Sequence, residues 1–148
     1  TNPEDGFCLL LPDGYAVDDS MTSDDGGGET AVYVDSLQDT AHARLFITVD
    51  DANGRSLDEL TTDKAAEIEA IMGSSPMWTF GLMLGGVPAN QFDQVPGQDL
   101  SRQAVLVHNS RLYTLTFIPD DPALGDAYAE MQTLYETVMD SFSFLWQS

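Results

Sequence analysis

Residues 102–118 read RQAVLVHNSRLYTLTFI, and the expected architecture follows from this stretch. Two runs rich in aliphatic, β-branched and aromatic residues, Arg102 to His108 and Arg111 to Ile118, flank the pair Asn109-Ser110. Two short strands around two turn-forming residues predict a β-hairpin. Asn109 tolerates a positive φ, whereas Ser110 fits such a turn less well than glycine would. Antiparallel pairing is therefore the first element of the fold.

A helix is predicted directly after this hairpin. The segment Pro119-Asp120-Asp121-Pro122 ends the sheet, and from about Asp126 to Ser141 apolar residues recur at steps of three and four. The recurring residues are Tyr128, Met131, Leu134, Tyr135, Val138 and Phe142. We expect this stripe to pack on the sheet, and residues 142–145 to form a short edge strand.

The clearest local signal is a second helix over residues 57–72. Ser56 stands three residues before Glu59, which is the spacing of a capping box. Asp58 and Glu59 also lie at the positive end of the helix dipole, and Gly73 is a natural helix end. The expected buried stripe consists of Leu57, Leu60, Lys64, Ile68 and Ile71, with Ala65 and Met72 beside it.

Apolar runs between turn signals predict the remaining strands. They are Phe7 to Leu11, Tyr15 to Val17, Thr30 to Val34, Ala43 to Val49, Pro76 to Leu84 and Val87 to Val95. In the run before Gly85, alternation places Trp78, Phe80, Leu82 and Leu84 on one face, and residues 18–29 are expected to form a mobile loop. The predicted fold is one α+β domain over residues 1–148. A mostly antiparallel sheet of about six to seven strands packs between or against two main α-helices.

Charge limits the possible partners. Asp and Glu number 25 against five Lys and Arg in 148 residues, a formal net charge of −20, and Lys64 is the single lysine. Such a field repels nucleic acid backbones and anionic membrane surfaces. We therefore expect no nucleic acid partner and no membrane insertion of this domain. A protein partner with a basic surface, divalent cations and plain solubility remain open.

Cysteine usage and the ends of the chain say little about function. Cys8 is the single cysteine, which excludes an intrachain disulfide, and its apolar surroundings favour a small buried side chain. No apolar run approaches the ~20 residues that span a bilayer. We interpret residues 1–6 as a mature or trimmed end that lacks a signal peptide.

The chain resembles the PsbP-like fold. The resemblance rests on the opening Leu11-Pro12-Asp13-Gly14-Tyr15, the capped helix start at Ser56, the turn Leu84-Gly85-Gly86-Val87-Pro88-Ala89, the hairpin end Arg111 to Phe117 and the closing Met139 to Phe144. Extrinsic subunits of photosystem II, a Ran-binding transport factor and many exported bacterial lipoproteins share this fold. The resemblance implies an α/β/α sandwich and a role in binding or assembly, with no catalytic residues to transfer.

No catalytic motif or cofactor signature is found in the sequence. Gly73-Ser74-Ser75-Pro76 is not a nucleophile elbow, and Gly26-Gly27-Gly28 lacks a dinucleotide-binding context. Lys64 lies in mid-helix and is interpreted as a snorkelling surface residue. His42 and His108 have no neighbouring histidine or cysteine, so hydrogen-bonded packing is favoured over metal ligation. We predict no enzyme, no catalytic residues and no cofactor.

Calcium binding is the sharpest alternative, because calcium prefers carboxylates and carbonyls from flexible loops. Three acidic clusters qualify, although ordinary acidic turns are the favoured explanation of all three. They are Asp18, Asp19, Asp24, Asp25 and Glu29; Asp50, Asp51 and Asn53; and Asp120 with Asp121. The middle cluster fails as an EF-hand, because Val49 and Leu60 occupy its first and last ligand positions. We predict no metal site.

A third possibility is a small-ligand carrier or small hydrolase with a pocket at the sheet–helix edge. Trp78, Phe80, Tyr113 and Phe117 are the aromatic residues that would line such a pocket, although aromatics at strand spacing usually form core. The favoured hypothesis is a non-enzymatic binding or assembly module, exported by a bacterium, extracellular or in the cell envelope, within a larger lipoprotein.

Overall fold

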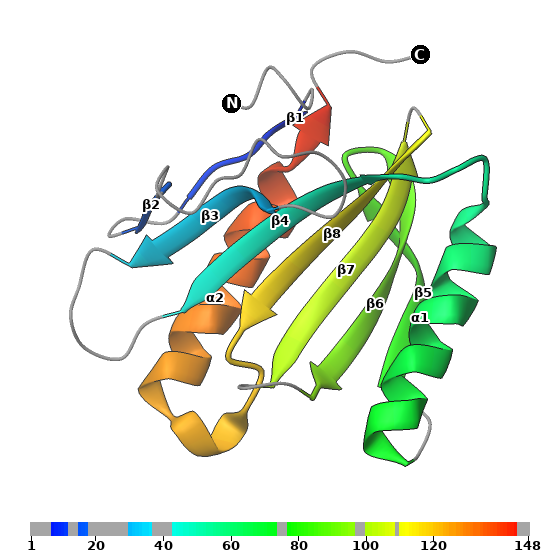
Figure 1. The fold of residues 1–148 in the computed structure, drawn as a ribbon. Helices are drawn as coiled ribbons and strands as arrows, with labels where there is room; N and C mark the ends of the chain where they lie inside the picture. Colours follow the sequence, from blue (N-terminus) through cyan, green and yellow to red (C-terminus); the bar gives the residue numbers. More distant parts are fainter. Residues whose placement is uncertain are drawn as a thin grey trace.

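The computed structural model describes residues 7–11, 15–17, 30–36, 43–73, 77–96, 100–108 and 110–144. Figure 1 shows a twisted sheet with a helix on either side. Neither helix in these ranges has the length and apolar character that crossing a membrane requires. The loop expected at residues 18–29, together with His42 and Asn109, lies outside the described residues.

A seven-stranded antiparallel sheet forms the centre of the described part of the chain. Its order is β2 (Tyr15–Val17), β3 (Thr30–Ser36), β4 (Arg44–Asp51), β8 (Arg111–Ile118), β7 (Ser101–His108), β6 (Val87–Val95) and β5 (Met77–Leu84). Each strand pairs antiparallel with its neighbours. The predicted α+β class is therefore confirmed, and so is the hairpin of β7 and β8, in which Ser110 adopts a φ of 64°.

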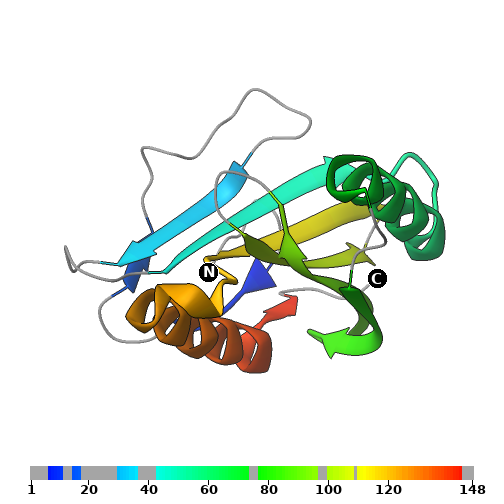
Figure 2. The ribbon, with the colours of Figure 1, turned by 90° about the horizontal axis from the view of Figure 1, so that it is seen from below.

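The two helices cover opposite faces of the sheet. Figure 2, seen from below, shows α1 (Leu57–Met72) on one side and α2 (Asp126–Ser141) on the other. A short 3₁₀ helix, η2 (Pro122–Leu124), leads into α2. α1 packs against β6 and β7, whereas α2 packs against β8. Both helix ranges match the expected ones, because capping and apolar periodicity are strong local signals.

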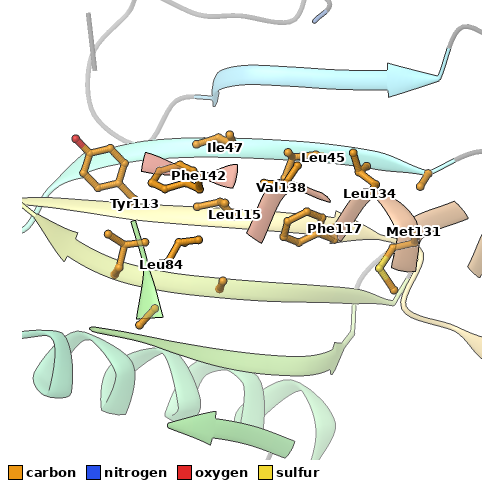
Figure 3. Close-up of a cluster of buried hydrophobic side chains, with 14 of the residues drawn as sticks. Leu45, Ile47, Leu84, Tyr113, Leu115, Phe117, Met131, Leu134, Val138 and Phe142 are labelled. Atoms are coloured by element: carbon orange, nitrogen blue, oxygen red, sulfur yellow. The ribbon is translucent and has the colours of Figure 1, made fainter. Parts of the chain in front are cut away.

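The larger core lies between α2 and the sheet (Figure 3). β4 contributes Leu45 and Ile47, and β8 contributes Tyr113, Leu115 and Phe117. The helix contributes the central part of its expected stripe, namely Met131, Leu134 and Val138. All eight side chains are almost fully buried, and burying each large apolar side chain stabilises the fold by about 1.5–3 kcal/mol.

α1 begins and ends as its sequence predicts. The Ser56 side chain accepts from the Glu59 backbone N–H, the Glu59 side chain accepts from the Ser56 N–H, and Gly73 takes the left-handed conformation with a φ of 77°. The buried stripe is shorter than expected, however. Ile68 is buried, but Ile71 and Met72 are exposed, because they lie in the last turn, beyond the part that packs on the sheet.

The expectation that Trp78 shares a face with Leu82 and Leu84 is wrong. A β-bulge interrupts β5 between Thr79 and Leu82, where two residues oppose one on β6. Gly81 in the bulge has a φ of 76°, which favours glycine. The extra residue reverses the alternation, so Trp78 packs with Phe92 on the α1 side while Leu82 and Leu84 join the α2-side core.

The first and last strands form a separate two-stranded ladder. β1 (Phe7–Cys8) pairs antiparallel with β9 (Ser143–Phe144), so the closing strand joins β1 and not the main sheet. The strand expected over Phe7 to Leu11 therefore ends at Cys8. The Leu10 backbone N–H instead donates to the Ser141 side-chain oxygen at 2.8 Å, which ties this segment to the end of α2.

Candidate functional site

The acidic clusters considered for calcium do not converge where the structure describes them. Asp51 Oδ1 accepts from the Asn53 backbone N–H at 2.7 Å, which is a local turn contact. Asp120 is buried, whereas Asp121 turns away to accept from the Ala123 N–H at 3.0 Å at the start of η2. Within the described ranges, no group of three or more His, Cys, Asp or Glu residues is placed to hold a metal ion. The Asp18-to-Glu29 cluster lies outside them.

The other candidate residues are dispersed. The His108 ring stacks on Phe144 with their centroids 3.8 Å apart, and its buried Nε2 has no hydrogen-bond partner among the described residues. Lys64 is half-buried on α1, where burial lowers the pKa of its ammonium and the negative charge of Glu67 raises it by a smaller amount. The His108 contact is therefore aromatic packing, and the charge that acts on Lys64 belongs to an acid of its own helix.

The aromatic residues considered as a pocket lining belong to separate parts of the protein. Tyr113 and Phe117 are buried in the α2-side core. Trp78 stacks on Phe92 in the α1-side cluster, with ring centroids 5.4 Å apart. The side chain of Phe80 lies outside the described residues. The described aromatics therefore do not come together as one pocket lining.

An ion cluster that the sequence analysis did not single out joins β6, β7 and the end of β8. Arg102 Nη2 contacts Asp120 Oδ1 at 3.3 Å, and Arg102 Nε lies 3.4 Å from Asp93 Oδ1. The Arg102 guanidinium carbon also lies 4.5 Å from the centroid of the Tyr135 ring. Asp120 is only 2% exposed, so its charge depends on this cation and on hydrogen bonds.

The cluster stabilises a second β-bulge. Asp93 and Gln94 both oppose Arg102, and Gln94 has a φ of 50°. The bulge removes the Gln94 N–H from the strand ladder, and Asp120 Oδ2 accepts from it at 2.8 Å. The Asp120 N–H donates to the Leu100 carbonyl at 2.8 Å. Both carboxylate oxygens of Asp120 are thus engaged within the chain, which leaves this cluster a structural role.

Tyr135 on α2 is the remaining member of the ion cluster. Its hydroxyl donates to Gln91 Oε1, and Gln91 Nε2 donates to Asp93 Oδ1 at 2.9 Å. Burial raises the pKa of Tyr135 above its ordinary 10.0; Arg102 and the Gln91 hydrogen bond lower it, while Asp93 and Asp120 raise it, each by less. The phenol is therefore neutral in the folded protein at ordinary pH, and it serves as a hydrogen-bond donor.

Most of the exposed large apolar side chains belong to β5 and the end of α1. Six large apolar side chains are exposed in the described residues, and four of them belong to these two elements. The four are Ile71 at 71%, Met72 at 40%, Met77 at 55% and Met83 at 62%. Figures 1 and 2 both show the end of α1 beside the start of β5. Met77 lies opposite Asp93 and so projects on the α2 side of the sheet, whereas Ile71 and Met72 belong to the helix on the other side. We call these four exposed residues the β5 edge.

Comparison of the backbone with solved structures identifies the fold. The chain is similar to the solution structure of cyanobacterial PsbP (CyanoP) from Synechocystis sp. PCC 6803, with a TM-score of 0.59. The likeness covers 97% of this chain and 89% of that one. The chain has a PsbP-like fold.

Sequence similarity adds no further information about this PsbP-like fold. Identity to the cyanobacterial protein is 13%, so the likeness concerns the fold alone. No protein-family model matches the chain, and no curated protein matches it. Fold similarity does not transfer a binding site, because one fold carries many functions. The function of this PsbP-like chain must therefore be argued from its own surface.

Proposed function

We propose that this chain is a non-enzymatic binding or assembly module that engages a basic protein. The observation that carries the proposal is the β5 edge, where Ile71, Met72, Met77 and Met83 are exposed on a chain of net charge −20. Large apolar side chains left exposed at the border of a sheet are candidates for contact with a partner. Charge on the surrounding surface selects partners of opposite sign and speeds their encounter.

The distribution of acids supports the same proposal. Asp120 is the one buried acid among the side chains whose burial the structure describes, and Arg102 compensates it internally. Other described acids, such as those on α1, are half-buried or exposed and contribute to the field that a partner meets. The proposal includes export from a bacterium, outside the cell or in the envelope, since a chain with one lysine and 25 acids suits a hydrated medium.

Affinity capture from a bacterial envelope extract tests this function. The immobilised chain should retain a basic protein that salt releases, because screening weakens attraction between surface charges. An unrelated domain of equal net charge serves as the control bait and should not retain the same protein. A broad screen of hydrolase substrates should stay silent. Turnover in that screen, or identical capture by both baits, would contradict the proposal.

A further inference from the structure

The apolar face of α1 continues past the cluster that the helix covers. Ile68 is buried in that cluster together with Phe92 and Val95. Ile71 and Met72 stand three and four residues after Ile68, and residues at these spacings share one face of a helix. The same face is therefore buried at Ile68 and exposed one turn later, where Ile71 is 71% and Met72 40% exposed.

Ile71 and Met72 are the two residues of the β5 edge that form one contact. Met77 projects on the α2 side of the sheet, and Met83 lies beside the turn at the opposite end of β5. Successive residues of a helix are separated by about 100°, so Ile71 and Met72 stand on either side of the direction of Ile68. A single large side chain of a partner can therefore touch both.

Acids border this apolar pair on both sides. Glu67 precedes Ile71 by four residues and Glu69 precedes Met72 by three, so one carboxylate neighbours each apolar side chain on the helix surface. Both acids are exposed. Lys64 is the single cation of the helix, and it interacts with Glu67. The charge around the pair is therefore negative overall.

The end of the helix is a second source of negative potential. The last four carbonyls of an α-helix have no partner within the helix, and they carry the negative end of its dipole. Lysine, arginine or histidine in the last turn compensates for this in many helices. α1 ends in Glu69-Ala70-Ile71-Met72, with no basic residue, and the Gly73 N–H donates to the Glu69 carbonyl at 2.8 Å. This end of α1 therefore favours a cation from another molecule.

The end of α2 has a similar charge pattern, but the chain itself packs there. The last turn of α2 also lacks a basic residue. Phe142 follows directly and is buried, and β9 then pairs with β1. The Leu10 N–H donates to the Ser141 side-chain oxygen at 2.8 Å. Of the two helices, α1 is therefore the one whose own last turn exposes large apolar side chains.

We propose that the C-terminal end of α1, from Glu67 to Gly73, is the surface that binds the basic partner protein. The inference rests on the proposed function and names its contact within the β5 edge. A large apolar side chain of the partner packs on Ile71 and Met72. Lysine or arginine side chains beside it face Glu67, Glu69 and the last carbonyls of the helix. A second copy of this chain does not fit, because its net charge of −20 would oppose the contact.

Titration with a synthetic peptide tests the inference. The probe carries one leucine between two pairs of lysines, and NMR follows the side-chain methyl groups of the protein. The methyl signals of Ile71 and Met72 should shift, while those of Met77 and Met83 stay in place. Ile71→Ser combined with Met72→Ser should weaken binding about tenfold, because the apolar contact is lost. Leu124→Ser is the control, because Leu124 is an exposed apolar residue in η2, and it should bind as the native chain does.

Two charge-matched double variants separate a local contact from general attraction. Glu67→Gln with Glu69→Gln removes two negative charges from α1, and Glu136→Gln with Asp140→Asn removes two from exposed positions on α2. The α1 pair should weaken peptide binding at least about fivefold, and the α2 pair less than about twofold, because close charges couple most strongly. Equal weakening by both pairs, or unchanged methyl signals at the end of α1, would overturn the inference.

The outcomes also separate this inference from the proposed function. Thermal melting of each variant shows whether it remains folded, and the apolar and the acidic double variants of α1 are independent of each other. If the captured basic protein binds both as tightly as the native chain, the α1 contact is wrong while the binding function stands. If nothing specific is captured, the function fails, and the inference fails with it.

Discussion

Asn90 on β6 donates from Nδ2 to Thr61 Oγ1 on α1 at 3.0 Å, and both residues are almost fully buried. This hydrogen bond is the polar contact by which α1 is fixed on the sheet beside the apolar cluster of Ile68, Phe92, Val95 and Val105. A buried amide without a partner is costly, so the bond specifies where the helix lies.

Replacing Thr61 with valine should destabilise the protein despite the nearly equal volume. The substitution leaves the Asn90 amide buried without its acceptor, at a cost of about 1–3 kcal/mol in the free energy of unfolding. Thr61→Ser keeps the hydroxyl and should recover most of that loss. Denaturant unfolding of both variants measures the difference, and equal stability of Thr61→Val and the native chain would contradict the assignment.

Replacing Asp120 with alanine should lower the free energy of unfolding more than most single substitutions among the residues that follow β8. It removes the acceptor for the Gln94 N–H and one partner of Arg102, for a loss of about 3 kcal/mol. Asp121→Ala is the matched control, because the Asp121 carboxylate accepts from the Ala123 N–H in a local turn contact. Chemical denaturation should give a loss of about 1 kcal/mol or less in the free energy of unfolding for the control. The reverse ranking would disprove the role given to Asp120.

Tyr135 should titrate later than an exposed tyrosine. Burial raises its pKa above 10.0, so the folded state holds its proton where the unfolded state has lost it. The stabilisation is therefore complete below pH 10 and is lost as the pH rises through the higher folded pKa. The difference in tyrosinate absorbance between the native chain and Tyr135→Phe isolates this group. A difference curve with its midpoint at or below 10.0 would be inconsistent with a buried phenol.

The contribution of Lys64 to stability should change with pH in the opposite direction to that of Tyr135. Its folded pKa lies below the ordinary 10.5, so the unfolded state binds more protons between the two values and stability rises with pH across that window. Lys64→Met removes the cost of burying the charge, so stability at neutral pH should not fall and the alkaline rise should disappear. Lys64→Arg, which keeps the charge, serves as the control. A clear loss of stability in Lys64→Met would show that the charge is favourable.

The helices and the antiparallel pairing could be predicted because their signals are local. Ser56, Glu59 and Gly73 specify the limits of α1 without reference to the rest of the chain. The same holds for the α2 stripe of Met131, Leu134 and Val138, whose spacing alone indicates a buried face. These local signals do not depend on the order or register of the strands that the helices pack against.

The bulges and the ion cluster could not be predicted from periodicity. Large apolar residues occupy every second position from Trp78 to Leu84, and the break at Gly81 is visible only as a glycine inside a strand. The contact between Arg102 and Asp120 depends on a second bulge at Gln94, which depends in turn on Asp120. Such mutual dependence arises only in the folded chain, although Arg102, as one of five cationic residues, was a signal worth following.

The most direct test of the β5 edge is amide hydrogen exchange of the free chain, followed by NMR. Leu84 and Val87 flank a two-residue turn and form a hydrogen-bonded pair, so the Met83 N–H points away from β6. We predict that the Met83 amide exchanges far faster than the amides of the central strand β8. If the Met83 amide were as strongly protected as those of Arg111–Ile118, another segment would already cover this edge, and its apolar side chains could not carry the proposed binding function.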